Sequence, residues 1–526
     1  MHTETLIRRA RGQQLGDMLR RSAARTPTRT ALIFRDQVDT FAELDAAVNR
    51  AAHALEARGV TRGDRVALFT HNNRAFVVLR FALARLGAVT TPVNFMLSAS
   101  DVAYILGHSG ARMMIAEDAL CATADAALAQ IGQDLPRFVI PHAGVDAPGG
   151  WQPVADLLDH DDASEVWRDV GPDDPIQMMY TSGTESRPKG ALQTSAALYA
   201  QYASCIIDGE MREDAVSLHC LPLFHCAQLD CFLSPDIYLG ATSIVHDRAD
   251  PAEMLVAIEQ HGVTRLFCPP TIWIALLRHP DFDTRDLSSL NAGYYGASIM
   301  PTAVIEELSR RLPNMRLFNF YGQTEMAPVA TILKPQDQLR KLGSAGRPAL
   351  NVETRVVDDD DMPVPVGDVG EIVHRSPHLI TEYYKDPEKT ADAFRGGWFH
   401  SGDLGRFDED GYLYVVDRKK DMIKTGGENV ASREVEEAIF RHPDVAEVAV
   451  FGVPHPKWIE AVTAAVVPKA GATLTADAVM AYCREALAHF KAPKHVEITD
   501  QLPKNASGKI LKRDLRLKFA GVFDAE

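Results

Sequence analysis

Short apolar runs alternate with longer helix-like stretches over the first half of the chain, and this alternation constrains the fold more than any other feature. Between Ala31 and about Leu239 the runs include "RVALFT", "ARMMIAE", "IQMMYT" and "AVSLHCLPL". The stretches between them, such as "ELDAAVNRAAHALEARG" and "AFVVLRFALARLG", have the apolar spacing of helices. Strands that alternate with helices indicate an α/β domain with parallel-rich sheets.

A second cycle follows in "TRLFCPP", "NAGYYGAS" and "MRLFNFYGQTE", where each apolar run ends in Gly, Pro or small residues. Ligands gather at the carboxyl ends of strands in such sheets, so a binding site is expected at these motifs. Between about Gly343 and Val416, segments such as "GYLYVVDR" predict short strands with tight turns, and hence a smaller β-rich subdomain. The run "DDDD", Asp358 to Asp361, is interpreted as an exposed hairpin turn, with a metal site as the alternative.

The composition changes after Arg418 to a compact α+β pattern of about a hundred residues, enough to fold separately. We therefore expect two domains. Residues 1–418 would form a large core, and residues 419–526 would form a small separate domain.

Charge and cysteine content narrow the functional classes. The 526 residues carry a net charge of −16, which argues against a general nucleic-acid or anionic-membrane binder. The arginine-rich start lacks the apolar core of a secretory signal, and no run approaches the roughly 18 apolar residues of a membrane span. Seven cysteines without a CxxC pair suggest a reducing compartment, so we expect a cytoplasmic protein, with a homodimer as the candidate assembly.

The stretch "TSGTESRPKG" follows an apolar run and precedes "ALQTSAALYAQYASCI", which predicts a strand-loop-helix unit. Such a loop can offer backbone N–H groups, hydroxyls and an ammonium to phosphate oxygens. The candidate phosphate-binding residues are Thr181, Ser182, Gly183, Thr184 and Lys189. The order of residues does not fit the common P-loop, and a plain surface turn is the alternative.

Four further motifs carry polar side chains at the ends of apolar runs. In "YGQTE", Thr324 could contact a phosphate oxygen while Glu325 holds Mg²⁺, a hard cation that prefers oxygen ligands. Asp403 in "WFHSGDLG" and Arg418 in "VVDRKKD" together suit the two hydroxyls of a ribose. Lys509 lies in the Ser-Gly-Lys turn of "LPKNASGKILKRDL". Taken alone, each motif also fits a turn or a surface salt bridge.

In this order and spacing, the motifs resemble the adenylate-forming superfamily of acyl-CoA synthetases, firefly-type luciferases and peptide-synthetase adenylation domains. The resemblance extends over essentially the whole chain, from "TFAELDAAVNRAAHALEARGVTRGDRVAL" through "LPLFH", "GYYGAS", "YGQTE" and "WFHSGDLG" to "DRKKDMIKTGGENV" and "NASGKI". It implies that a carboxylic acid and ATP, with Mg²⁺, form an acyl-adenylate, and that the acyl group then passes to a thiol.

The resemblance also assigns roles to residues. The loop from Thr181 to Gly190 would hold the β- and γ-phosphates, with Thr184 and Glu325 on Mg²⁺ and Thr324 on the α-phosphate. The adenine and acyl pocket would be lined by Gly296, Ala297, Ser298, Tyr321 and Gly322, with Tyr321 stacked on the base. Asp403 and Arg418 would bind the ribose, and Lys509 would reach the carboxylate and the α-phosphate. Rotation about Lys420 would then withdraw Lys509 and present Gly426 and Gly427 to coenzyme A.

His225 in "LPLFH" lies where family members keep a residue that gates the acyl site. The spacing in "HCLPLFHCAQLDC" could also suggest zinc, although the stretch fits a buried strand in which cysteine is a small hydrophobe. In the phosphate loop, Glu185 and Ser186 stand where most relatives carry Thr-Gly. We expect Glu185 to face water or to pair with Arg187, because an acid beside phosphate would oppose binding.

The resemblance favours an acid:CoA ligase, since "DRKKDMIKTGGENV" and the C-terminal region are typical of acyl-CoA synthetases, and no fused carrier domain follows Glu526. Two alternatives stay open, which are an enzyme that loads a separate carrier protein and a nucleotide-binding relative with little ligase activity. A luciferase-like oxidation ranks behind them. The expected pocket segments are apolar without a Lys or Arg for a second carboxylate, which favours a fatty or aryl monocarboxylic acid.

Overall fold

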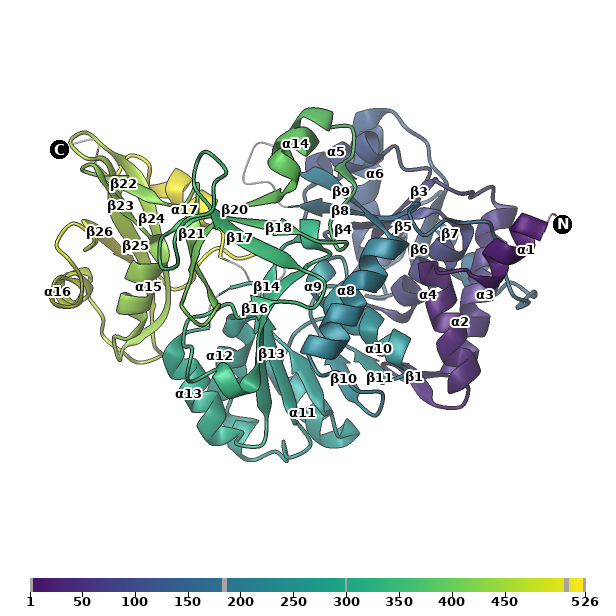
Figure 1. The fold of residues 1–526 in the computed structure, drawn as a ribbon. Helices are drawn as coiled ribbons and strands as arrows, with labels where there is room; N and C mark the ends of the chain where they lie inside the picture. The colour runs from purple at the N-terminus through teal and green to yellow at the C-terminus, as the bar shows by residue number, and fades with distance from the viewer. Residues whose placement is uncertain (1–2, 182–186, 299, 506–509, 524–526) are drawn as a thin grey trace.

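The computed structural model describes residues 3–181, 187–298, 300–505 and 510–523, and the strands among them form four sheets (Figure 1). Sheet 1 contains, in spatial order, β19 (Glu382–Tyr383), β9 (Lys189–Thr194), β8 (Pro175–Thr181), β4 (Val89–Val93), β3 (Arg65–Phe69), β5 (Met113–Glu117), β6 (Arg137–Ile140) and β7 (Gln152–Pro153). From β8 to β7 every neighbouring pair is parallel, whereas β8, β9 and β19 pair antiparallel.

Sheet 2 repeats this design. Its order is β16 (Arg347–Pro348), β15 (Val329–Leu333), β14 (Arg316–Gly322), β13 (Ala292–Gly296), β12 (Arg265–Phe267), β10 (Val216–His219), β11 (Thr242–Val245), β1 (Thr30–Phe34) and β2 (Gln37–Thr40). The strands from β14 to β1 pair parallel, and antiparallel strands close both edges. These two sheets confirm the predicted α/β class with parallel-rich sheets.

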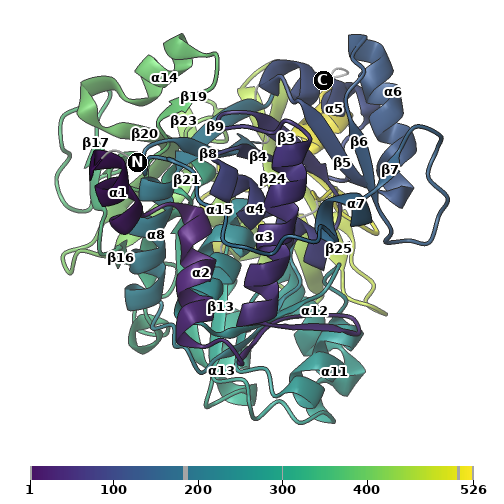
Figure 2. The ribbon, with the colours of Figure 1, turned by 90° about the vertical axis from the view of Figure 1, so that its right-hand side faces the viewer.

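Helices join and cover these sheets. They include α1 (Thr3–Ala10), α2 (Leu15–Arg25), α3 (Phe41–Ala57), α4 (Arg74–Leu86), α5 (Ala99–Ser109), α6 (Cys121–Ile131), α7 (Ala155–Leu158), α8 (Ser195–Asp208), α9 (Cys226–Gln228), α10 (Ser234–Leu239), α11 (Pro251–His261), α12 (Pro270–Arg278) and α13 (Thr302–Arg311). Figure 2 shows α2, α3 and α4 together on one side of the molecule. Their apolar faces share one buried core with residues of both sheets, such as Leu32 of β1 and Leu68 of β3.

Local sequence signals explain where these helices start and stop. Thr40 and Glu43 form a capping box at α3, in which the Thr40 hydroxyl accepts the Glu43 N–H and the Glu43 carboxylate accepts the Thr40 N–H. Helix α4 ends at Gly87, whose φ of 71° suits a residue without a Cβ. Such caps satisfy backbone groups that a helix leaves without partners at its ends.

The predicted strand-loop-helix unit after "IQMMYT" is wrong in one respect. Residues 189–194 form β9, which pairs antiparallel with β8, and α8 begins only at Ser195. Residues 190–194 are buried, and β9 is hydrogen-bonded to β8 on one side and to β19 on the other, which holds the segment as a strand. Thr194 then caps α8 by accepting the Ala197 N–H.

Residues 353–418 form the predicted β-rich subdomain. Sheet 3 consists of β17 (Glu353–Val357), β18 (Gly370–Arg375), β20 (Phe399–Phe407) and β21 (Leu413–Arg418), all antiparallel, with α14 (Pro387–Ala393) beside it. The acidic run is an exposed turn, as predicted, since the Asp358 N–H donates to the Met362 carbonyl and the Asp358 carboxylate accepts the N–H groups of Asp360 and Met362.

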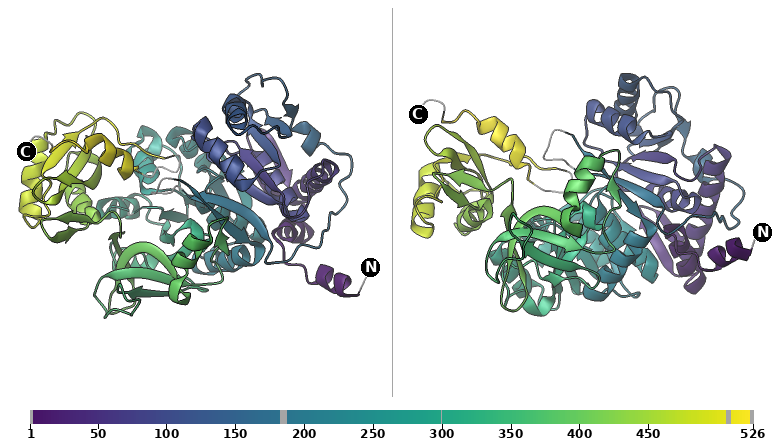
Figure 3. Two further views of the ribbon diagram at one scale, coloured as in Figure 1. Left: turned by 90° about the horizontal axis from the view of Figure 1, so that it is seen from above. Right: turned by 45° about the horizontal axis from the view of Figure 1, so that its top comes forward.

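The last hundred residues form a sheet of their own. Sheet 4 contains β22 (Ile423–Thr425), β23 (Glu428–Val430), β24 (Val445–His455), β25 (Ile459–Pro468) and β26 (His495–Ile498), flanked by α15 (Ser432–Phe440), α16 (Ala476–Ala486) and α17 (Lys512–Phe519). Figure 3 shows this part set apart from the rest of the molecule. The Asp417 carboxylate links it to β21 by accepting the N–H and the hydroxyl of Ser432.

Two further features bear on the expectations from composition. Across the described ranges, no helix has both the length and the apolar character that crossing a bilayer requires. All seven cysteines of the sequence lie among the described residues, and each is buried with a free thiol.

Candidate active site

Tyr321, Asp403 and Arg418 meet where sheet 2 faces sheet 3. The Tyr321 hydroxyl donates to Asp403 Oδ2 at 2.7 Å, and Arg418 Nε lies 3.3 Å from Asp403 Oδ1. Asp403 and Arg418 are directly opposite each other on β20 and β21. Burial raises the pKa of Tyr321, and the Asp403 carboxylate raises it further, so the phenol stays protonated and donates. The structure thus brings together three residues that the sequence predicts at one nucleotide site.

Glu325 and Lys189 both contact the side chain of Tyr383. Glu325 lies in a short 3₁₀ turn, η4 (Thr324–Met326), and its side chain is buried. Its Oε1 accepts the Tyr383 hydroxyl at 2.8 Å, while Lys189 Nζ lies 4.1 Å from the centre of the Tyr383 ring. β19 carries Tyr383 beside β9, which begins at Lys189. An ammonium and a buried carboxylate therefore flank one aromatic ring, an arrangement that suits phosphate groups with a bound cation.

Thr324 lies between sheet 1 and the loop that carries His225. Gln193 Nε2 donates to the Thr324 carbonyl at 2.9 Å, and the Cys226 thiol lies 3.5 Å from the Thr324 hydroxyl. His225 caps α9, with its Nδ1 accepting the Ala227 N–H at 3.1 Å. The predicted gate residue and the predicted phosphate contact are thus held on adjacent segments.

Gly296 and Gly322 are fixed by close backbone packing. A Cβ at Gly296 would overlap the Phe320 carbonyl oxygen, and one at Gly322 would overlap the Pro328 carbonyl oxygen. Gly296 pairs with Phe320 across β13 and β14, and the exposed residues Ala297 and Ser298 follow at the carboxyl end of β13. Ala297 has a φ of 64°, which turns the chain sharply at the end of β13.

The predicted phosphate loop is described only at its ends. Thr181, the last residue of β8, pairs with Lys189. Ser182, Gly183, Thr184, Glu185 and Ser186 lie outside the described residues, so the expected pairing of Glu185 with Arg187 stays a prediction. The Arg187 guanidinium lies 5.4 Å from the centre of the Tyr104 ring.

The C-terminal candidates lie elsewhere. Gly426 and Gly427 form the two-residue turn between β22 and β23, and their φ values of 59° and 89° suit a type I′ turn. Figure 1 shows β22 and β23, the strands that this turn joins, well apart from β14. Lys420 lies in the turn that follows β21. Lys509 is outside the described residues, whereas Lys504 and Ile510 on either side of it form a β-bridge.

In the stretch "HCLPLFHCAQLDC", which could suggest zinc, the side chains make other contacts. His219 is buried, with its Nδ1 2.7 Å from Gln228 Nε2 and its Nε2 3.2 Å from Asp236 Oδ2. Burial raises the pKa of the Cys226 and Cys231 thiols well above the ordinary value, which favours the protonated form that does not bind metal. These cysteines pack as small hydrophobic residues.

Sequence reasoning missed Tyr383 and Gln193, which contact Glu325 and Thr324 respectively. The segment that contains Gln193 is predicted as a helix from its sequence, whereas it lies in β9, where every residue after Lys189 is buried. Tyr383 comes from the segment "ITEYYKDP", whose only signal is an aromatic pair before an Asp-Pro turn. Both residues reach the site through strand pairing between segments far apart in the sequence.

Comparisons with known proteins match most of this chain to one enzyme family. Residues 19–384 match the family model described as AMP-binding enzyme, and residues 434–509 match the AMP-binding enzyme C-terminal domain. A feruloyl-CoA synthase of Amycolatopsis sp is 38% identical over 97% of this chain and 100% of its own length. An indoleacetate–CoA ligase of Aromatoleum aromaticum is 37% identical over 96% of this chain and 98% of its own length.

Solved structures agree with these relatives. The anthranilate CoA ligase AuaEII, determined with anthranoyl-AMP, superposes with a TM-score of 0.89 at 26% identity, covering 96% of this chain and 97% of that one. ATP-bound MatB from Rhodopseudomonas palustris superposes with a TM-score of 0.88 at 29% identity, covering 97% and 99%. With its sheets, its polar cluster and these matches taken together, the chain belongs to the AMP-binding enzyme family.

Proposed function

We propose that this protein is an ATP-dependent acid:CoA ligase that converts a fatty or aryl monocarboxylic acid to its CoA thioester. The observation that carries the proposal is the convergence of Tyr321, Asp403 and Arg418 with Glu325 and Lys189 around the end of β14. The first set suits a ribose and a base, and the second suits phosphates and Mg²⁺. Relatives named as feruloyl-CoA, indoleacetate-CoA and fatty-acid-CoA ligases support the thiol acceptor.

The reaction would proceed in two steps. A carboxylate oxygen of the acid attacks the α-phosphorus of ATP, and pyrophosphate leaves. The thiol sulfur of CoA then attacks the acyl carbonyl of the adenylate, and AMP leaves while the thiol proton passes to solvent. Negative charge grows on the phosphoryl oxygens in the first step, so Lys189, Thr324 and Lys509 placed around them would lower the barrier.

Mg²⁺ fits the donors at this site. Glu325 is a buried carboxylate that accepts one hydrogen bond from Tyr383 on Oε1, and a carboxylate has further lone pairs for a hard cation. Thr184 is the second proposed ligand. The cation would neutralise phosphate charge when bound, while Asp403 would accept from a ribose hydroxyl and Arg418 would hold the Asp403 carboxylate in place.

Further parts of the proposal concern organisation. Residues 1–418 form the core and residues 419–526 the mobile lid, with the hinge at Lys420 and with Gly426 and Gly427 beside the entering thiol after rotation. His225 gates the acyl pocket. Sheet 4 with its separate core supports this division. We place the enzyme in the cytoplasm, and a homodimer remains the candidate assembly.

The decisive test is acid-dependent and CoA-dependent AMP formation. Purified protein is incubated with Mg²⁺ and ATP, with and without CoA, against a panel of aromatic and straight-chain monocarboxylic acids, and AMP and thioesters are separated by chromatography. A ligase yields AMP and the thioester in equal amounts. Acyl-adenylate or AMP without thioester would instead indicate that CoA is not the acceptor, and absence of every product with every acid would contradict the proposal.

A further inference from the structure

Two histidines and a glutamate that the proposed reaction does not use converge at one edge of sheet 1. His71 follows β3 by two residues, Glu117 ends β5, and His142 follows β6 by two residues. These three strands are parallel neighbours in the order β3, β5, β6. The carboxyl ends of parallel strands share one edge, so the fold itself gathers the three side chains.

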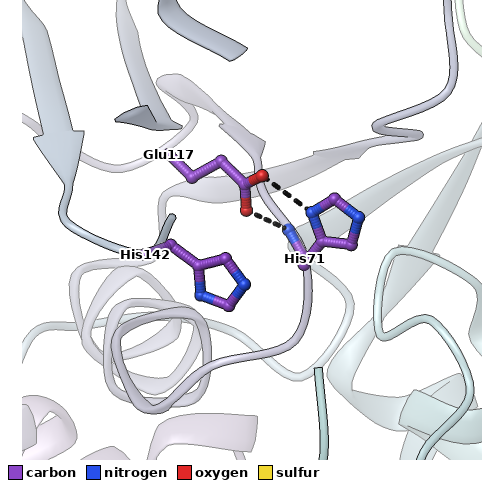
Figure 4. Close-up of side chains that lie close together, drawn as sticks. All are labelled: His71, Glu117 and His142. Carbon is purple, nitrogen blue, oxygen red and sulfur yellow. Dashed lines mark hydrogen bonds and ion pairs between the residues drawn. The ribbon is translucent and has the colours of Figure 1, made fainter. Parts of the chain in front are cut away.

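The side chains have the geometry of a metal-binding group. One ligand atom of each residue lies within 4.8 Å of the corresponding atoms of the other two. The planes of the two imidazole rings differ by 2°, with centroids 5.7 Å apart, and Figure 4 shows the rings side by side with the Glu117 carboxylate next to both. The lone pair of an imidazole nitrogen lies in the ring plane, so a cation would bind at the edges of the two parallel rings, beside the Glu117 carboxylate, and not between the ring faces.

Glu117 and His71 are held in fixed positions. The Glu117 side chain is 1% exposed, and its Oε2 accepts the His71 N–H at 2.8 Å and the Thr70 hydroxyl at 3.2 Å. Its Oε1 lies 2.7 Å from His71 Nδ1. The other face of the His71 ring packs on Phe95, with centroids 3.7 Å apart. Hydrogen bonds from one backbone N–H and one hydroxyl thus orient the carboxylate before any ligand arrives, as outer groups do at metal sites.

His142 is positioned through its backbone. The Asp118 carboxylate accepts the N–H groups of residues 142 to 145 at distances from 2.8 to 3.2 Å, which fixes the loop that carries the ring. Asp247 Oδ2 lies 3.5 Å from His142 Nε2, and the same carboxylate pairs with Arg35 at 3.2 Å. A second carboxylate therefore stands close to the cluster, with the Arg35 guanidinium beside it.

We propose that His71, Glu117 and His142 form a binding site for a divalent cation of the late first transition row, such as Zn²⁺. Two imidazoles and one carboxylate suit such a cation, whereas Mg²⁺ prefers sites made of oxygen alone. Binding would require an unprotonated nitrogen on each ring, so bonds to the cation would replace the hydrogen bond between His71 Nδ1 and Glu117 Oε1. The site is separate from the Mg²⁺ position at Glu325 in the proposed function.

Calorimetric titration with ZnCl₂ tests the site on the full-length protein prepared without a histidine tag. We expect one Zn²⁺ per chain with a Kd of about 10 µM or tighter. His142→Ala and His71→Ala should each weaken binding about tenfold or more, because each removes one ligand. The His142 change leaves the loop's hydrogen bonds to Asp118 in place, since these come from the backbone. Circular dichroism checks that each variant is folded.

His160→Ala is the matched control. His160 lies beside His53, with ring centroids 5.8 Å apart. The substitution therefore removes an imidazole from a different pair of histidines. Its affinity and stoichiometry for Zn²⁺ should equal those of the unaltered protein. Cobalt(II) provides an independent readout, because loss of its visible absorption bands in His142→Ala places the ion at this ring. Failure of the unaltered protein to bind either metal, or equal binding by His142→Ala, would overturn the proposal.

Discussion

Tyr383 contacts two residues of opposite charge. The effect of the Glu325 charge on the reaction can therefore be tested apart from the hydrogen bond that Glu325 accepts. The tyrosine donates to Glu325 and lies beneath the Lys189 ammonium, so each of the three positions depends on the others. A change that keeps the hydrogen bond but removes the charge can therefore isolate what the charge does.

Glu325→Gln is that change. Its amide oxygen can still accept the Tyr383 hydroxyl, but the side chain no longer carries the charge that would bind Mg²⁺. We expect kcat for adenylation to fall about 100-fold or more, with a higher Mg²⁺ requirement. Tyr383→Phe is the matched control, since it keeps the ring under Lys189 and the carboxylate, and should cost less than about tenfold. Pyrophosphate-release rates over a range of Mg²⁺ concentrations measure both, and equal losses would argue against a metal role for Glu325.

The charge of Glu185 gives a second prediction at this scale. At about 4 Å from a phosphate charge and an effective dielectric near 20, the repulsion would be roughly 4 kcal/mol, which a working ATP site could not leave uncompensated. An acid turned to water costs about 1 kcal/mol or less. We expect Glu185→Thr with Ser186→Gly to lower the KM for MgATP several-fold and to leave acid preference unchanged. Weaker use of ATP by the double variant in steady-state kinetics would instead give Glu185 a positive role.

At the level of elements, His374 on β18 illustrates how burial changes acid stability. It is fully buried, its Nδ1 lies 3.0 Å from the Thr354 hydroxyl on β17, and its ring neighbours Tyr321. Burial lowers the pKa of His374 to about 3 from an ordinary value of 6.5. Between these values the unfolded chain binds the proton and the folded chain does not, so stability falls as the pH drops below 6.5.

We expect His374 alone to lower the free energy of unfolding by about 2 kcal/mol between pH 7 and pH 5. His374→Gln removes the titrating group, so the shift in melting temperature between these two pH values should be smaller than in the unaltered protein. His489→Gln, at an exposed position, serves as the control and should keep the original shift. Scanning calorimetry at both pH values checks this, and an unchanged shift in His374→Gln would show that other groups dominate.

The sequence predicted elements best where local pattern and tertiary pairing agree. Buried parallel strands such as β3 and β5 are continuous apolar runs, and the glycines at 296 and 322 end strands where a Cβ would overlap a neighbouring carbonyl oxygen. β9 was assigned to a helix because its strand character comes from pairing with β8 and β19, which local spacing does not reveal. The contact of Tyr383 with Glu325 was not predicted for the same reason, because it depends on the pairing of β19 with β9. The approach of Tyr321 to Asp403 followed from the resemblance and not from spacing.

For the whole molecule, a buried ionic network joins the helices that lie between the two large sheets. Arg80 on α4 is 1% exposed, and its Nη2 lies 2.6 Å from Asp230 Oδ1. Gln177 on β8 and Tyr202 on α8 donate to the same carboxylate at 2.8 and 3.0 Å. Burial raises the pKa of Asp230, while Arg80, Gln177 and Tyr202 each act to lower it.

Arg80→Met should therefore destabilise the protein by about 3–5 kcal/mol, because it leaves Asp230 buried without its counter-charge. Arg80→Met with Asp230→Leu removes both charges and should recover much of that loss, since an apolar pair avoids the desolvation cost. Urea denaturation followed by tryptophan fluorescence measures the two differences. A double variant less stable than Arg80→Met would mean that the polar network contributes more than the ion pair.

The proposed rotation of the C-terminal part relative to the core involves the whole molecule. Substitutions at Lys420 can test it. The residue lies between β21 and β22, where residues 421 and 422 donate to the Arg418 carbonyl at 2.9 and 3.2 Å. Proline fixes φ near roughly −65°, so Lys420→Pro should leave adenylation measurable while crippling thioester formation from a supplied acyl-adenylate. Lys420→Ala keeps the torsional freedom and should retain both half-reactions.

Lys509→Ala should show the opposite pattern, with adenylation nearly abolished and thioester formation largely intact, because Lys509 would serve only before the rotation. Single-turnover assays of each half-reaction separate these outcomes. Normal overall turnover in Lys420→Pro would place the pivot at another residue, and equal loss of both half-reactions in Lys509→Ala would refute the division of labour between the two orientations.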